Sequence, residues 1–162
     1  MLILVRHGKS DWGADFGRDH ERPLAPRGIE AAGNIGSFLT RAGLAPTAVL
    51  SSTAVRAHTT AELAARAGGW ECGEIERHAA LYDATVQDSL DVLRAVPDAH
   101  ETVAAFGHEP TWSNLASTLI GGGTLKMVTA AAVGIEIAPA SWSALEAGCG
   151  QLRFFMPPRL LA

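Results

Sequence analysis

The chain has 162 residues, 48% of them hydrophobic, which is enough for one domain to bury a core without disulfides or metals. Its net charge of −4 at pH 7 argues against an electrostatic surface for nucleic acid. No run approaches the roughly eighteen apolar residues of a membrane span, and the apolar N-terminal run is too short for a signal peptide. Cys72 and Cys149 lie far apart in no metal-ligand spacing, so we expect free thiols and a cytoplasmic location. Any anionic ligand must therefore meet a local cluster of positive groups.

The first predicted element is a buried strand at Leu2 to Val5, which ends abruptly in Arg6, His7 and Gly8. A long polar loop follows over residues 8–26, and loops of this length in a compact domain are usually functional or disordered. Apolar residues at helical spacing then predict a helix that starts near Pro26 and stops at Gly43.

The middle of the chain repeats this order of strand, polar tip and helix. "TAVLSS" predicts a strand that ends in Ser51 and Ser52, and an Ala-rich helix over 53–69 carries Arg56 in its first turn. A weaker strand lies within 74–81, and a helix over 85–97 has Thr85 as its N-cap. "TVAAFGH" is a further strand, ending in Gly107 and His108, before a helix within 109–123.

The C-terminal part changes pattern. "AVGIEIA" and "QLRFFMP" alternate like strands and are joined through "EAGCG" without a helix, which predicts an antiparallel hairpin at a sheet edge. The whole chain, 1–162, therefore predicts one domain of the α/β class. We expect a three-layer αβα sandwich with a mainly parallel sheet and an antiparallel C-terminal edge.

In such a sheet, ligands bind beyond the carboxyl ends of the strands. The residues expected there include two arginines, Arg6 and Arg56, and two histidines, His7 and His108. Guanidinium groups match phosphate oxygens with paired N–H donors, and a neutral imidazole beside them can attack phosphorus. The sequence thus predicts a phosphate pocket with a histidine nucleophile.

Three motifs carry a resemblance to a known family: "LVRHGKS", "SSTAVRAHTTA" and "FGHEP", in that order along the chain. Together they resemble the histidine phosphatase superfamily, whose fold is phosphoglycerate-mutase-like. The short length and the segment "RPLAPRGIEAA" look most like its small SixA-type phosphohistidine phosphatase branch.

By this resemblance His7 is the nucleophile that becomes phosphohistidine, and Arg6, Arg56 and His108 complete the phosphate pocket. A backbone carbonyl near Gly8 is expected to bind the other ring N–H of His7 and fix its tautomer. Gly8 and Ser52 are further candidates for substrate contacts, although Ser at a strand end also commonly caps the next helix. No cofactor is implied.

The three motifs do not include a clear general acid. Phosphomonoester members of the family carry a carboxylate that protonates the leaving alkoxide, and the candidate here is Asp83 in "AALYDAT". A phosphohistidine needs no such acid, because its imidazole can leave already protonated on the far nitrogen. We therefore expect removal of phosphate from phosphohistidine on a partner protein such as a phosphotransfer domain.

Other interpretations stay open. The substrate can be a small phosphoester or diphosphate metabolite with Asp83 as the acid, or the chain can bind phosphate without turnover. Zinc on His7 and His108 would lack a third ligand, so no metal site is expected. The sequence holds no GxSxG elbow and no Walker or dinucleotide motif.

The remaining candidates have ordinary structural explanations. Arg18, Arg22 and Arg27 in the 9–27 loop can meet an acidic partner or form a solvated face, and Trp12 can line the pocket or simply pack. His58 points to another helix face than Arg56. The other histidines lie in polar contexts and are expected at the surface: His20, His78 and His100.

Overall fold

The computed structural model describes residues 1–138 and 141–161. The strands are β1 Leu2–Arg6, β2 Ala48–Ser52, β3 Glu76–His78, β4 Val103–Gly107, β5 Ala132–Ile137 and β6 Gly150–Met156. The α-helices are α1 Pro26–Arg41, α2 Val55–Gly68, α3 Val86–Arg94 and α4 Thr111–Leu119. Short 3-10 turns lie at Asp19–Glu21, Ala79–Leu81, Trp142–Ala144 and Pro158–Leu160.

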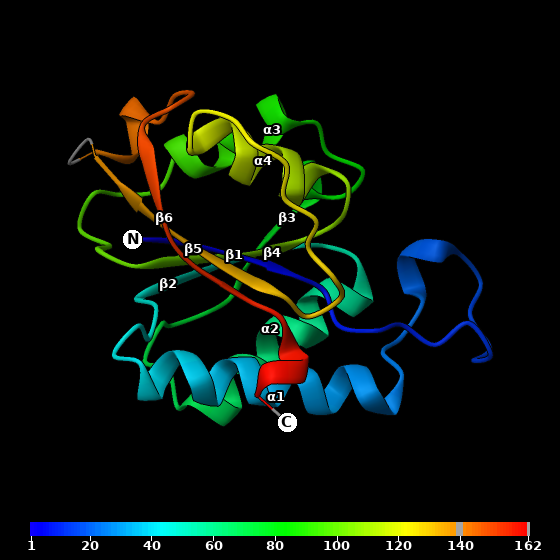
Figure 1. Cartoon of the computed structure of the whole chain (residues 1–162). Coiled ribbons are helices and arrows are strands. Elements are labelled where there is room, and N and C mark those ends of the chain that lie inside the picture. The colour runs from blue at the N-terminus through cyan, green and yellow to red at the C-terminus, as the bar shows by residue number, and fades with distance from the viewer. Residues whose placement is uncertain (139–140, 162) are drawn as a thin grey trace.

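The strands form one six-stranded sheet in the order β3-β2-β4-β1-β5-β6. The first four in this order are parallel, whereas β5 runs antiparallel to both β1 and β6. Helices α1 and α2 cover one face and α3 and α4 the other, as Figure 1 shows. The predicted αβα sandwich with an antiparallel C-terminal edge is confirmed.

The alternation of side chains along β1 explains why both faces of the sheet are covered. Leu2 and Leu4 belong to the core under α3 and α4, while Ile3 and Val5 belong to the core over α1 and α2. All four are fully buried. A strand that is apolar on both faces needs a helical layer on each side, and this is what the βα order of the chain supplies.

Local signals read from the sequence mostly hold. Thr85 caps α3 in a reciprocal capping box with Asp88, as its position predicted. Both cysteines are free thiols.

The connection between β5 and β6 differs from the expectation that it lacks a helix, because it contains the 3-10 turn Trp142–Ala144. The backbone N–H of Trp142 donates to the Asp98 carboxylate, and its indole N–H donates to the carbonyl of His100. None of the described helices is long and apolar enough to cross a membrane.

The parallel strands place the polar tips of β1, β2 and β4 at one end of the sheet. Arg6 pairs with Gly107, and Ser51 pairs with Phe106. The first residue after β1, His7, continues the ladder through its backbone N–H to the carbonyl of Gly107 at 3.0 Å. A backbone hydrogen bond therefore joins the turn that carries His7 to the strand end that carries His108.

Two glycines of α1 face α2 in different ways. A Cβ on Gly36 would overlap the backbone of Ala64, so the helices approach closely there. A Cβ on Gly33 would lie 3.7 Å from the Cβ of Ala67, which is ordinary contact.

We expect Gly36→Ala to lower the free energy of unfolding by about 1–3 kcal/mol, because α1 and α2 must move apart. Gly33→Ala is the matched control and should be neutral or stabilising by up to about 1 kcal/mol through helix propensity. Urea denaturation of both variants measures this. Equal effects of the two substitutions would show that the close approach at Gly36 does not matter.

Candidate active site

The His7 side chain is fixed by a hydrogen bond to its own neighbour. Its Nδ1 lies 2.7 Å from the carbonyl oxygen of Gly8, and the residue is only 8% exposed. A carbonyl can only accept, so Nδ1 carries the proton and Nε2 keeps its lone pair. The predicted role of a carbonyl at Gly8 in fixing the tautomer is confirmed.

Gly8 itself is held from two sides. Its N–H donates to Thr60 Oγ1 at 2.9 Å, and that hydroxyl donates in turn to the carbonyl of Arg56 at 2.6 Å. A Cβ on Gly8 would overlap Gly28 in the first turn of α1. The N–H of Gly8, a candidate for substrate contacts, is thus engaged within the protein, and the lack of a side chain at Gly8 lets α1 approach the turn of His7 and Gly8.

Arg6 directly precedes His7, and Arg56 comes from the first turn of α2. Arg6 Nη1 donates to the carbonyl of Met127 at 2.8 Å, and Arg56 Nη1 donates to the carbonyl of Asp19 at 2.7 Å. The Nε atoms of both arginines are buried and have no hydrogen-bond partner among the described residues. These are donors that an anion can satisfy.

His108 completes the group from β4. Its ring centroid lies 5.1 Å from that of His7, and its Nε2 lies 2.8 Å from Ser52 Oγ. Ser52 Oγ accepts from the backbone N–H of Ala54, so its own hydroxyl hydrogen is available to His108 Nε2. Where the Ser52 hydroxyl donates to Nε2, the His108 proton is on Nδ1, which is buried and unpartnered among the residues described. Ser52 is fully buried and orients His108.

The loop before α1 brings a further arginine and a carboxylate to the site. Asp19 accepts from Arg22 through Oδ1 at 2.7 Å and from Arg56 through Oδ2 at 3.0 Å. Arg22 also donates to Ser10 and is only 6% exposed. The suggestion that Arg22 forms part of a solvated face is therefore wrong, whereas Arg18 and Arg27 are exposed.

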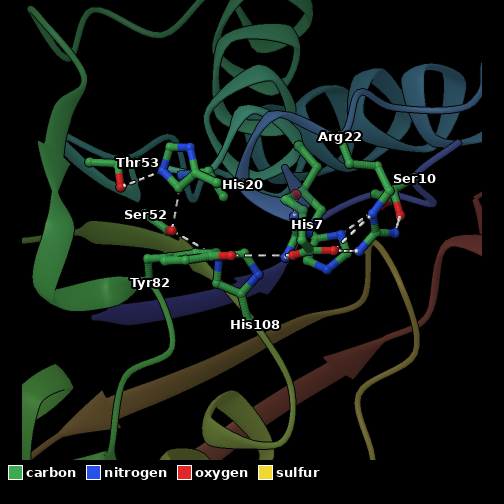
Figure 2. A network of polar contacts seen from close by, with 12 residues as sticks. His7, Ser10, His20, Arg22, Ser52, Thr53, Tyr82 and His108 are labelled. Atoms are coloured by element: carbon green, nitrogen blue, oxygen red, sulfur yellow. Dashed lines mark hydrogen bonds and ion pairs between the residues drawn. The ribbon is translucent and has the colours of Figure 1, made fainter. Parts of the chain in front are cut away.

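His20 and Tyr82 form the side of the site next to His108 (Figure 2). The Tyr82 ring meets both imidazoles edge-on, with centroids 4.8 Å from His20 and 5.7 Å from His108. His20 Nε2 also lies 2.9 Å from Thr53 Oγ1. His20, which was expected at the surface, is half-buried and has partners, because the 3-10 turn Asp19–Glu21 brings it against Thr53 and Tyr82.

Several sequence candidates lie outside the central cluster. Trp12 is 68% exposed and stacks on the Arg22 guanidinium at 3.6 Å from the ring centroid. His58 pairs with Glu62 on α2, and His78 pairs with Glu76 on β3. The carbonyl of His100 binds the indole N–H of Trp142.

Asp83 borders a cavity of about 240 Å³ that opens beside His108. Two other carboxylates, those of Asp19 and Glu109, also line this cavity, together with Arg56 and Tyr82. The Asp83 side chain is exposed, and its backbone is left-handed with φ of 53°. The structure thus brings Asp83 to the rim of the site rather than into the cluster of arginines and histidines.

Burial and positive charge keep both histidines neutral. Burial, and then the charges of Arg56, Arg6 and Arg22, lower the pKa of His7 to about 4, against the raising effect of the Gly8 hydrogen bond. Burial, His7 and Arg56 lower the pKa of His108 to about 3. Burial alone would raise the pKa of Asp19, but Arg22 and Arg56 bring it below its usual range.

The cluster can therefore hold an anion and attack it. It combines guanidinium groups with two imidazoles, one of which has an unprotonated Nε2, in one largely buried place. Residues 1–138 and 141–161 hold no group of three or more His, Cys, Asp or Glu side chains arranged to bind a metal ion. The chemistry favoured by these groups is nucleophilic attack on a phosphoryl group.

Comparison with known proteins agrees with this geometry. The family model of the histidine phosphatase superfamily (branch 1) matches residues 2–88, which include Arg6, His7 and Arg56. An uncharacterized protein of Mycobacterium tuberculosis is 38% identical over 171 residues, covering 96% of this chain and 100% of its own length.

Solved structures share the fold. The protein histidine phosphatase SixA, complexed with tungstate, superposes with a TM-score of 0.85 at 23% identity and 99% coverage of both chains. A mycobacterial glucosyl-3-phosphoglycerate phosphatase superposes with a TM-score of 0.67 at 14% identity, covering 96% of this chain and 98% of its own. The fold is that of SixA, in agreement with the branch that the motifs resemble. The chain belongs to the histidine phosphatase superfamily, branch 1, and is a phosphatase.

Proposed function

We propose that the chain removes phosphate from phosphohistidine on a partner protein, through a covalent phosphohistidine on its own His7. The observation that carries the catalytic part is the His7 tautomer. Nδ1 is bound to the Gly8 carbonyl, so the unprotonated Nε2 is the nucleophile, and it lies among unsatisfied donors of Arg6, Arg56 and His108.

In the first step the phosphoryl group of the substrate lies against these donors. The guanidinium groups of Arg6 and Arg56 and the imidazole of His108 bind its oxygens and stabilise their charge as the bonds change. His7 Nε2 supplies the electron pair of a new N–P bond, and the leaving group departs with the pair of the old bond. The Gly8 carbonyl stabilises the cationic imidazole that results, because it keeps its hydrogen bond to Nδ1–H.

In the second step a water molecule attacks the phosphorus of phospho-His7. Its oxygen forms the new P–O bond, the N–P bond breaks, and the electron pair returns to Nε2. The products are inorganic phosphate, a released proton and neutral His7. The same donors bind the phosphoryl oxygens in both steps, so one pre-formed pocket serves formation and breakdown of the intermediate.

The carboxylates at the cavity support a P–N substrate. The ion pairs of Asp19 with Arg22 and Arg56 keep it ionised, and Glu109 accepts hydrogen bonds from the Ser113 N–H and hydroxyl. Neither is placed as a proton donor, and Asp83 is exposed. An alkoxide leaving group needs such a proton, whereas an imidazole that carries its proton on the far nitrogen does not.

A small phosphoester or diphosphate is the second candidate substrate. It is supported by Asp83, which borders the cavity and has neither an ion pair nor a side-chain hydrogen bond among the described residues. The fold similarity to a glucosyl-3-phosphoglycerate phosphatase is compatible with this candidate. A module that only binds phosphate is less well supported, because binding alone does not require an unprotonated imidazole nitrogen among the arginines.

The substrate prediction is tested with a phosphotransfer domain phosphorylated on histidine and with an alkyl phosphate, whose alkoxide leaving group needs a proton. We expect the ratio kcat/KM to be higher for the phosphoprotein, because its leaving group needs no general acid. Equal or lower kcat/KM for the phosphoprotein would contradict the proposed substrate and leave the phosphatase assignment standing.

Asp83→Asn separates the two candidate substrates. Asn tolerates the left-handed backbone at this position, so the fold should be unaffected. If Asp83 is a general acid for esters, ester hydrolysis falls by about 10²–10⁴-fold. For the phosphoprotein, we expect Asp83→Asn to change the rate of hydrolysis by less than about threefold, since no proton has to be delivered to the leaving imidazole.

The depressed pKa of His7 makes a separate prediction for the pH dependence. The neutral form attacks, and it predominates at every pH above about 4, so kcat/KM should show no loss near the ordinary imidazole value of 6.5. Initial rates between pH 5 and pH 8, corrected for ionisation of the substrate, test this. An NMR titration of the imidazole identifies the group, and a His7 pKa near 6.5 would contradict the burial argument.

A further inference from the structure

A second cavity, of about 280 Å³, is lined by Lys9, which directly follows the turn of His7 and Gly8. Its walls come from four separate segments of the chain. Among its lining residues are Lys9, Arg27, Glu30, Val128 and Arg159. We call this cavity the basic groove.

The basic groove shares backbone with the catalytic site. Lys9 directly follows Gly8, and its carbonyl accepts the N–H of Ala25 at 2.8 Å. On the other wall, Val128 directly follows Met127, whose carbonyl binds the Arg6 guanidinium. The backbone N–H of Ala130 lies 3.0 Å from the carbonyl of His7. A chain segment bound in the groove therefore lies immediately beside the phosphate pocket.

The charge of the groove is opposite to that of the protein. Three cations line it, Lys9, Arg27 and Arg159, against the single carboxylate of Glu30, although the net charge of the chain is −4. All three cations are exposed. Within residues 1–138 and 141–161 none of them forms an ion pair, in contrast to Arg22 and Arg56 in the catalytic site.

Arg159 is positioned by packing of the C-terminal turn. Pro157 before the turn is buried, and Leu161 after it packs against the core between the sheet and α1. Figure 1 shows this turn, in red, lying against α1. The guanidinium of Arg159 is thus carried on an anchored segment rather than on a free end. Arg27 faces the same cavity from the first turn of α1.

We propose that the basic groove binds a carboxylate-rich segment of the phosphoprotein substrate, next to the phosphohistidine. This inference rests on the proposed function and names the feature by which the partner is recognised. Carboxylates complement the three cations, and the exposed side chain of Val128, 46% accessible, offers an apolar contact within the same groove. A small phosphoester that occupies the phosphate pocket alone does not reach these charges.

The kinetic test uses Arg27→Glu/Arg159→Glu, which reverses two of the three cations. The matched control is Arg41→Glu/Arg77→Glu, which makes the same charge change at exposed sites, at the C-terminal end of α1 and on edge strand β3. We expect KM for the phosphoprotein to rise about tenfold or more in the groove variant and less than about twofold in the control. The value of kcat/KM for an aryl phosphate should stay unchanged in both.

A binding measurement keeps this test independent of the substrate prediction. A fluorescein-labelled peptide with four glutamates is titrated with wild type and both variants at low salt, and anisotropy gives Kd. We expect weaker binding only in the groove variant, with an affinity that falls as salt rises. Equal Kd in all three proteins overturns the inference, even if the phosphoprotein is the preferred substrate. Weaker binding in the groove variant alone supports it, even if phosphoprotein hydrolysis is not detected.

Discussion

The hydrogen bond from His7 Nδ1 to the Gly8 carbonyl is the interaction on which the site depends. It holds the imidazole with Nε2 unprotonated, and it keeps that ring in one orientation. The bond requires a fixed Gly8 peptide, which Thr60 supplies from α2 through the Gly8 N–H, while Gly28 of α1 packs against Gly8. The proposed nucleophile is thus fixed by contacts from both helices on one face of the sheet.

The electrostatics of the site follow from the same close packing of groups around His7. The arginines proposed to stabilise a phosphoryl group also oppose protonation of His7, so they keep the proposed nucleophile unprotonated. Asp19 balances Arg22 and Arg56, which would otherwise bring positive charges together without compensation. Among the described residues, the three cations of the basic groove beside this site have no ion-pair partner, which suits the groove to recognising negative charge on a partner.

Much of this arrangement could be predicted from the sequence, because it depends on strand order. Arg6, His7 and His108 follow apolar strands directly, and parallel strands must bring such tips together. Arg22, His20, Asp19 and Thr60 could not be placed in the same way. The first three lie in an irregular loop with no periodicity, and Thr60 meets Gly8 across 52 positions of the chain. The signal that was available is the unusual length of the polar loop, which indicates function without saying which side chain turns inward.

The most direct test of this account is the position of phosphate on the trapped enzyme. Wild type and His7→Ala are mixed with a labelled phosphodonor, quenched in alkali within the first turnover, and the phosphoenzyme is examined by ³¹P NMR and by peptide mapping. We predict an acid-labile, base-stable phosphate on Nε2 of His7 that is absent from His7→Ala. A phosphate on Nδ1, on another residue, or on a hydroxyl would contradict the mechanism, because the Gly8 carbonyl leaves only Nε2 free to attack.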